Sequence, residues 1–121
     1  MANTDKITES IQRYGAAWNH TDPEQRRALL DGAFATSGVF SDPLSYVEGR
    51  EALLAHMQEF HDTKPGCSFT FEGDINVVRR HHRFRWKLHT PDGAVALTAT
   101  NFGESDEAGA LTLMVDFFDQ R

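Results

Sequence analysis

Hydrophobic residues in the first half of the chain recur at steps of three and four, the spacing of one face of an α-helix. The first stripe consists of Ile7, Ile11, Tyr14 and Trp18. The sequence DPEQ at 22–25 can cap and start a second helix, whose apolar positions run on to Phe34. A third helix is expected over 51–61, before Lys64-Pro65-Gly66 stops it. The pattern therefore predicts three N-terminal helices.

After residue 67 the hydrophobic period changes to two, which is typical of half-buried strands. Strands are expected at 68–77, 82–90, 94–102 and 110–118. The connections between them are short and rich in turn residues, which favours antiparallel pairing. The sequence therefore predicts an α+β fold, in which the three helices pack in the concave face of a curved antiparallel sheet.

The last expected strand is apolar on both sides. Leu111, Leu113, Val115 and Phe117 would face one way, and Thr112, Met114, Asp116 and Phe118 the other. Helices can cover only one of these two faces. We therefore expect the outer sheet face to be buried in a homodimer.

Composition limits the class of protein. A chain of 121 residues with 40% hydrophobic and 25% charged residues fits a single globular domain over 1–121. The lone Cys67 has no intrachain partner, as is usual in a reducing compartment. No apolar stretch approaches the roughly 20 residues of a membrane span, and the N-terminus lacks the pattern of a signal peptide. A cytoplasmic protein without a membrane partner is expected.

The charge pattern argues against nucleic acid as a partner. The formal net charge is −6, and the one basic run, residues 79–87, alternates cations with aromatic residues. In a strand, Arg83 and Arg85 would face away from Phe84 and Trp86. The aromatic side chains are then expected in the core or a pocket, and the cations outside.

The order and spacing of several motifs resemble a known family. The motifs are IQRYGAAWN, VFSDP, YVEGREALLAHM, RFRW and GALTLMVDFFD. Together they resemble the nuclear transport factor 2-like superfamily, in its SnoaL-like and ketosteroid-isomerase-like branch. The resemblance implies a cone-shaped shell around a pocket, usually in a dimer. It does not fix the reaction, because this fold hosts isomerases, cyclases, dehydratases, epoxide hydrolases and binding proteins.

Three residues match the ketosteroid isomerase pattern. In those enzymes the acid of the DP turn is the general base, and a tyrosine with a protonated aspartate holds the enolate oxygen. Asp42 matches the base and Tyr14 the tyrosine, while Asn101 stands at the third position, with an amide that can still donate a hydrogen bond. Structural roles remain open, because an acid before proline is also a common turn residue and Tyr14 lies on the core stripe.

Asp116 is a second candidate acid. Its phase places it between Met114 and Phe118, where loss of solvation would raise its pKa. The motif VDFFD also resembles the last strand of limonene-epoxide-hydrolase-type proteins, in which an aspartate helps to activate water. The resemblance implies an arginine and a further aspartate two residues apart, but here that region reads Arg83-Phe84-Arg85. The structural alternative is a carboxylate near a strand end that reaches solvent or caps a helix terminus.

The 6 histidines do not have the spacing of a metal site, so no metal ligands and no cofactor are expected. His82 shares a strand face with Phe84 and Trp86 and can serve as a proton carrier or donor in the pocket, or as an ordinary edge histidine.

The sequence thus predicts a mostly apolar pocket for a small-molecule ligand. The expected wall residues are Trp18, Phe40, His82, Trp86, Met114 and Phe118. The favoured chemistry is cofactor-free acid and base catalysis on a small, largely apolar carbonyl compound, of isomerase, cyclase or lyase type. Asp42 is favoured as the base over Asp116, because water activation needs a second acid that is missing from its usual place. The alternatives are a binding protein without turnover and an epoxide hydrolase.

Overall fold

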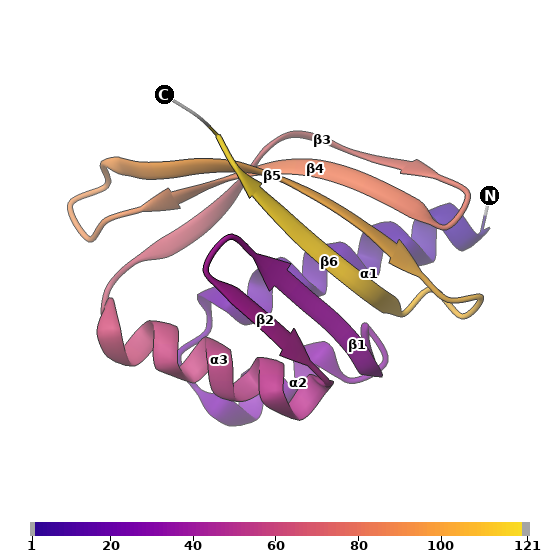
Figure 1. The fold of residues 1–121 in the computed structure, drawn as a ribbon, viewed down its shortest axis with the longest axis horizontal. Helices are drawn as coiled ribbons and strands as arrows, with labels where there is room; N and C mark the ends of the chain where they lie inside the picture. Colours follow the sequence, from indigo (N-terminus) through magenta and orange to yellow (C-terminus); the bar gives the residue numbers. More distant parts are fainter. Residues whose placement is uncertain (1, 120–121) are drawn as a thin grey trace.

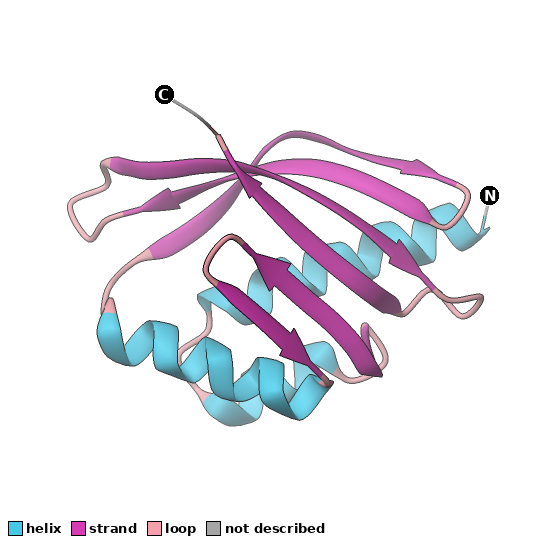
Figure 2. Ribbon diagram, in the orientation of Figure 1, coloured by secondary structure: helices cyan, strands magenta, loops and turns pink. Residues whose placement is uncertain are grey.

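A computed structural model describes residues 2–119 of the protein, which form three helices and one curved, unclosed sheet of six strands (Figures 1 and 2). The elements in chain order are α1 (Ala2–Asn19), α2 (Pro23–Leu30), β1 (Phe34–Asp42), β2 (Ser45–Glu48), α3 (Arg50–Thr63), β3 (Ser68–Val78), β4 (His81–His89), β5 (Val95–Ser105) and β6 (Leu111–Phe118). The α+β class predicted from the sequence is confirmed, but the predicted order of three helices followed by strands is wrong, because β1 and β2 precede α3. None of the helices within the described residues has both the length and the apolar character needed to cross a membrane.

The sheet is mixed, so the expectation of a purely antiparallel sheet was wrong. The strand order is β2-β1-β6-β5-β4-β3, and β1 runs parallel to β6 while the other neighbours are antiparallel. Parallel strands need a long crossover connection, and here the chain between β1 and β6 runs through β2, α3, β3, β4 and β5. In Figure 1, the β1–β2 hairpin lies between α3 and β6.

The hairpin of β1 and β2 was not predicted, and Ala33 and Phe34 were wrongly assigned to the second helix. Helix α2 ends at Leu30, and Gly32 turns the chain with a φ of 78°. The register between β1 and β6 then shifts between Phe34 and Val39, which breaks the alternation of buried and exposed residues. A strand with an interrupted period carries little signal in the sequence.

The other features predicted for the first two helices, the cap of α2 and the apolar stripe of α1, are present in the structure. Asp22 caps α2 by accepting a hydrogen bond from the Glu24 backbone N–H at 3.3 Å, and Pro23 occupies the first turn. In α1, the predicted stripe is buried from Ile7 to Tyr14, with Trp18 packed at its end. Burial of one such side chain contributes about 1.5–3 kcal/mol to stability.

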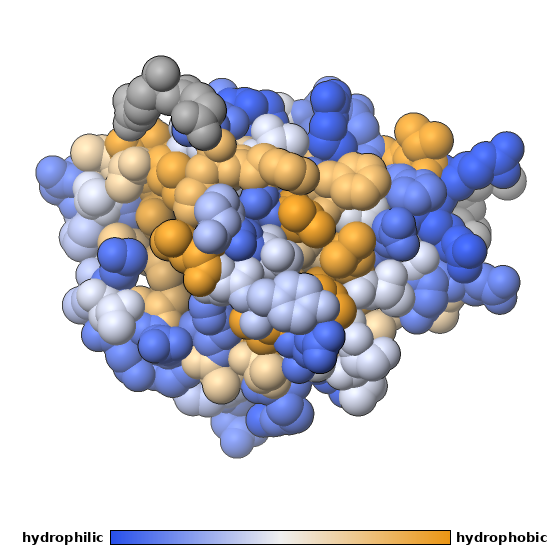
Figure 3. Space-filling model, in the orientation of Figure 1, coloured by the Kyte–Doolittle hydropathy of each residue, from blue (hydrophilic) through white to orange (hydrophobic). Residues whose placement is uncertain are grey.

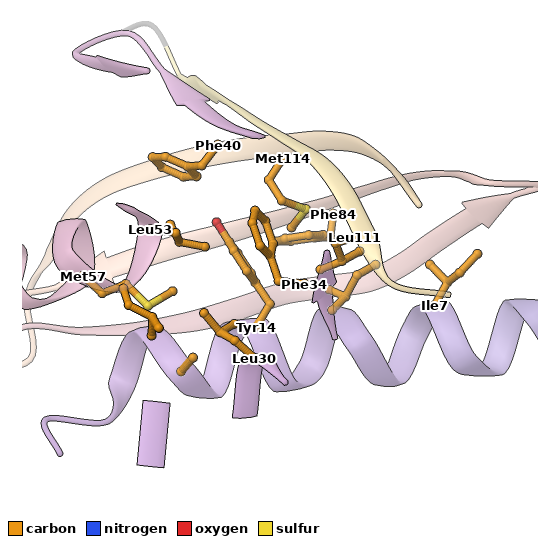
Figure 4. Close-up of a cluster of buried hydrophobic side chains, with 13 residues drawn as sticks. Ile7, Tyr14, Leu30, Phe34, Phe40, Leu53, Met57, Phe84, Leu111 and Met114 are labelled. Carbon is orange, nitrogen blue, oxygen red and sulfur yellow. The ribbon is translucent and has the colours of Figure 1, made fainter. Parts of the chain in front are cut away.

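The core lies between α1, α3 and the inner face of the sheet (Figure 4). Its main members are Ile7, Ile11, Tyr14, Leu30, Phe34, Phe40, Leu53, Met57, Phe84, Leu111 and Met114. Leu111 was expected on the outer face, but it is fully buried on the same side as Met114. Between Leu111 and Leu113, the register of β6 shifts against both of its neighbours, β1 and β5. The alternation of inner and outer side chains therefore changes after the first residue of the strand.

The outer face of β4 carries the cations, as predicted. Arg83 and Arg85 are exposed, while His82 and Phe84 are buried on the inner face. Arg85 pairs with Asp119 at 2.8 Å and with Glu72 at 3.5 Å. The basic run is therefore partly neutralised by acids of the same sheet.

Candidate active site

A cavity of about 600 Å³ lies between the helices and the inner face of the sheet. Its size suits a small organic molecule. Eight large aromatic side chains line it, namely Trp18, Phe40, Phe60, Phe69, Phe71, Phe84, Trp86 and Phe118. Polar residues also line it, among them Tyr14, Asp42, His56 and Asp116. The cavity can therefore surround an apolar body and address a small number of polar groups on it.

Trp18, near the end of α1, is the centre of the aromatic wall. Its ring lies 5.8 Å from that of Phe40, 5.7 Å from Phe60 and 5.4 Å from Phe69. These tilted and edge-to-face arrangements are favourable for aromatic rings. Helix α1, strand β1, helix α3 and strand β3 thus each contribute one ring to the same wall.

The structure places four of the six predicted pocket residues on the cavity wall, namely Trp18, Phe40, Trp86 and Phe118. The contribution of α3 was not predicted, and His56 and Phe60 line the cavity from this helix. These two residues are four positions apart, and so on one helix face, which is a signal the sequence does contain. Leu44 in the turn and Ser45 at the start of β2 were also missed, because the hairpin that holds them was not predicted.

Asp116 on β6 is the most buried acid on the cavity wall, with 8% of its surface exposed. Its Oδ1 accepts hydrogen bonds from Asn101 Nδ2 at 2.7 Å and from Trp86 Nε1 at 2.9 Å. Burial raises the pKa of Asp116 to about 6, although the two hydrogen bonds lower it and the charge of Asp42 raises it slightly. Oδ2 has no hydrogen-bond partner among residues 2–119, so it is the oxygen available to a ligand.

Tyr14 reaches the cavity from the middle of α1. Figure 4 shows its hydroxyl pointing away from the helix, toward the side of Phe40 and Met114. The hydroxyl is buried and has no hydrogen-bond partner within the described part of the chain. Burial, and then the charge of Asp116, raise the pKa of Tyr14 well above 10, although the Trp18 side chain, which can only donate to the Tyr14 oxygen, lowers it, so the hydroxyl stays protonated. It is a preformed donor without an acceptor.

Asp42 ends β1 and lies at the turn into β2. Its Oδ1 accepts a hydrogen bond from the Leu44 backbone N–H at 2.8 Å, which is the turn role that the sequence left open. Asp42 also lines the cavity, and its charge raises the pKa of both Asp116 and Tyr14. One carboxylate therefore serves the turn and contributes negative charge to the cavity.

Three predicted site residues lie behind the cavity wall. Asn101 has 0% of its surface exposed, and its Nδ2 donates to Asp116 instead of facing the cavity. His82 is 2% exposed and contacts Asn101 through its Nε2 at 2.8 Å. Met114 is fully buried in the core. Strand phase placed these residues on the correct face but could not show that other side chains cover them.

The cavity has neither the arginine of an epoxide hydrolase nor a cluster suited to a metal. Arg83 and Arg85 lie on the outer face of β4 and are exposed. Within residues 2–119, no group of three or more His, Cys, Asp and Glu side chains could hold a metal ion. The titratable groups on the cavity wall are instead three carboxyl groups, a phenol, an imidazole and an ammonium group, and Asp116 is the most buried of the carboxyl groups.

Comparison with known proteins places the chain in a family. Residues 11–109 match the SnoaL-like domain. The chain belongs to the SnoaL-like family. No curated protein matches its sequence.

Solved structures agree with this assignment. A candidate isomerase of the SnoaL-like family from Agrobacterium tumefaciens is 30% identical, with a TM-score of 0.88 over 96% of this chain and 99% of that chain. A candidate SnoaL-like polyketide cyclase from Jannaschia is 14% identical, with a TM-score of 0.74 over 95% of this chain and 86% of that one. An NTF2-like protein from Exiguobacterium is 15% identical, with a TM-score of 0.74 over 93% and 99%. The last two show the shared fold alone.

Proposed function

We propose that this SnoaL-like protein is a cofactor-free acid and base enzyme, of isomerase or cyclase type, that acts on a small, largely apolar carbonyl compound. One observation carries the proposal. A buried carboxyl group with a pKa of about 6 and an unpartnered tyrosine hydroxyl line the same aromatic cavity. A carboxylate whose pKa approaches the working pH is suited to take and return a proton.

The reaction begins with a proton on a carbon next to the carbonyl group. Asp116 Oδ2 takes this proton, so that a C–H bond breaks and the carboxylate becomes a carboxylic acid. The electron pair moves onto the carbonyl oxygen, which accepts a hydrogen bond from the Tyr14 hydroxyl. In an isomerase, Asp116 returns the proton to another carbon. In a cyclase, the enolate carbon attacks a second carbonyl group, whose oxygen receives the proton.

Asp116 is better suited than Asp42 to be the base, although the sequence favoured Asp42. An oxygen of Asp42 is used by the Leu44 backbone in a turn, and Asp42 is only half-buried. Asp116 is held from behind by Asn101 and Trp86 and leaves one oxygen for the ligand. Fixed orientation and low solvation are the two properties that a general base needs.

Exchange of a carbon-bound proton tests the function. Incubation of a panel of small aromatic ketones with the protein in D₂O should give deuterium at the carbon next to the carbonyl group, as seen by proton NMR. Because the base must be ionised, the exchange rate should rise with pH and reach half its maximum near the pKa of Asp116, which is about 6. If ketones bind but their protons do not exchange, the proposed enzymatic function is wrong and the protein is a binding protein.

A binding protein without turnover is the second candidate, and the aromatic wall favours it. Rings around Trp18 would hold an apolar ligand without any acid or base. Such a protein would show saturable stabilisation by the ligand and no product. The exchange experiment, run beside thermal unfolding with the same ketones, separates the two candidates.

We also propose that the outer sheet face pairs with a second copy of the chain. Phe102 is 40% exposed and Phe117 is 58% exposed, with Leu113 and Val115 partly exposed beside them. Figure 3 shows hydrophobic atoms gathered over β5 and β6 on this face. The rim carries both signs of charge in the pair Arg85–Asp119, and His81 lies 3.6 Å from Glu104, so the rim does not repel a second copy through charge of a single sign.

Light scattering tests this pairing. The wild type is expected to run as a dimer at micromolar concentration, and Phe117→Arg is expected to run as a monomer, because it places a charge in the apolar patch. Val78→Arg is a matched control, since Val78 is also exposed but lies at the far end of β3. A monomeric wild type would contradict the proposal.

A further inference from the structure

Three buried polar side chains form a row that runs from the cavity wall into the sheet. They come from three neighbouring strands, Asp116 from β6, Asn101 from β5 and His82 from β4. Asn101 Nδ2 lies 2.7 Å from Asp116 Oδ1, and His82 Nε2 lies 2.8 Å from Asn101 Oδ1. Only Asp116 lines the cavity. His82 and Asn101 therefore cannot touch a ligand there, and their role has to act through Asp116.

The donors in this row have one possible direction. An ionised carboxylate only accepts hydrogen bonds, so the end of Asn101 that faces Asp116 must be the NH₂ group. The other end is then the carbonyl oxygen, which needs a donor. His82 must supply it, with its proton on Nε2. The direction of donation is thus from His82 to Asn101 and from Asn101 to Asp116.

The His82 ring is held in one position by its surroundings. It lies over Gly103, its cross-strand partner on β5, where a Cβ atom would come within 2.7 Å of Nε2 and 2.0 Å of the Leu113 carbonyl oxygen. On another side it stacks on Phe84, with ring centroids 5.7 Å apart. Burial lowers the pKa of His82, so the ring is neutral near pH 7, and its Nδ1 has no partner among the described residues. A neutral His82 ring that cannot rotate donates its Nε2–H in one direction only, toward Asn101 Oδ1.

We infer that His82 is a positioning residue, which orients the amide of Asn101 so that Asn101 donates to Asp116 and leaves Asp116 Oδ2 facing the cavity. Without the donor at His82, the amide can turn over and present its oxygen to the carboxylate, which disfavours the ionised form. The catalytic consequence rests on the proposed function, but the control of proton affinity holds with or without turnover.

The pKa of Asp116 in the ligand-free protein is the direct readout, from a pH titration of its carboxyl carbon by NMR. The other groups that face Asp116 are Tyr14 from α1, Asp42 from β1 and Trp86 from β4, and none of them contacts His82 in a hydrogen bond. His82→Leu should raise the pKa of Asp116 by about one unit, a tenfold change in the ratio of its two forms. His82→Gln should restore the wild-type pKa, because its amide N–H can take the place of Nε2–H.

The same substitution one residue earlier is the control. His81→Leu changes an exposed ring that stacks on Phe102 and lies outside the row, so the pKa of Asp116 should not move. An unchanged pKa in folded His82→Leu, or an equal rise in His82→Gln, would overturn the inference.

A measurement on the wild type keeps the inference testable if His82→Leu does not fold. Nitrogen NMR of the imidazole should show a neutral His82 ring with its proton on Nε2 at about pH 7. A proton on Nδ1 alone, or a cationic ring, would overturn the proposed direction of donation.

Turnover separates this inference from the proposed function. If wild-type protein exchanges the ketone proton, His82→Leu should move the rising limb of the pH-rate profile upward together with the pKa of Asp116, and lower the rate on that limb about tenfold. If no ketone is turned over but the pKa still moves as expected, the positioning role stands and the enzymatic function is what fails.

Discussion

Asp116→Asn is expected to lower turnover by at least about 100-fold, the low end for loss of a general base. The amide has almost the shape of the carboxylate, and its oxygen can still accept the hydrogen bonds that Asn101 and Trp86 give to Oδ1. What the substitution removes is the ability of the cavity-facing atom to take a proton. Initial rates across a pH series, with binding checked by thermal stabilisation, measure this effect.

The same variant should be more stable than the wild type at neutral pH. The folded pKa of Asp116, about 6, lies above its ordinary value of 3.8, so the folded state binds this proton more tightly than the unfolded state. The cost of ionising the buried group is therefore absent below about pH 4, grows as pH rises toward 6, and is complete above that. At about 1.4 kcal/mol per pKa unit, Asp116→Asn should gain up to about 3 kcal/mol near pH 7.5.

Urea unfolding at about pH 7.5 and about pH 4 checks this stability difference. The gain of Asp116→Asn over wild type should shrink toward zero at the lower pH. A variant that is less stable than wild type at pH 7.5 would show that the carboxylate is a stabilising group and not a functional one held at a cost.

Asp42→Asn is the comparison that decides between the two acids. With Asp116 as the base, loss of the Asp42 carboxylate should reduce turnover by less than Asp116→Asn does, because Asp42 only contributes charge to the cavity and a cap to the turn. It should also lower the midpoint of the pH-rate profile slightly, since its charge raises the pKa of Asp116. If Asp42→Asn abolishes turnover and Asp116→Asn is tolerated, the base is Asp42.

Much of the fold followed from the sequence, because long elements with one buried face have a clear period. Helix α1 and strands β4 and β5 are such elements, and the inner face of β5 carries Leu97, Ala99 and Asn101 as alternation predicts. The β1–β2 hairpin could not be predicted, because its register shift removes the period and because pairing with β6 depends on residues about 75 positions away.

For the residues of the candidate site, the sequence predicted only which face of the sheet each one occupies. Period-two alternation places Asn101, Asp116 and His82 on the inner face, but it does not say which of them reaches the cavity. That depends on the curvature of the sheet and on the register between strands, which sets Asn101 opposite Asp116. A polar residue in phase with apolar ones can therefore be a wall residue or a support behind the wall, and the sequence does not distinguish these.

Tyr14→Phe tests the other half of the proposed chemistry. The hydroxyl is buried and unpartnered among the described residues, so it contributes nothing to the fold that a hydrogen bond would provide. Its removal should leave the free energy of unfolding equal or slightly higher. A donor to a developing oxyanion is worth about 100- to 1000-fold in kcat, so turnover should fall by that factor while the KM for the ketone changes little.

The control for Tyr14→Phe is Tyr46→Phe, which removes the same atom from an exposed tyrosine on β2 whose hydroxyl donates to Glu48 at 2.9 Å. That variant should keep full activity. The midpoint of the pH-rate profile should also stay near 6 in Tyr14→Phe, because the hydrogen bonds to Asp116 Oδ1 come from Asn101 and Trp86. If folded Tyr14→Phe protein has an undiminished kcat, another group binds the carbonyl oxygen of the ketone. The Tyr14 hydroxyl would then have no catalytic role, and Tyr14 would only pack in the core.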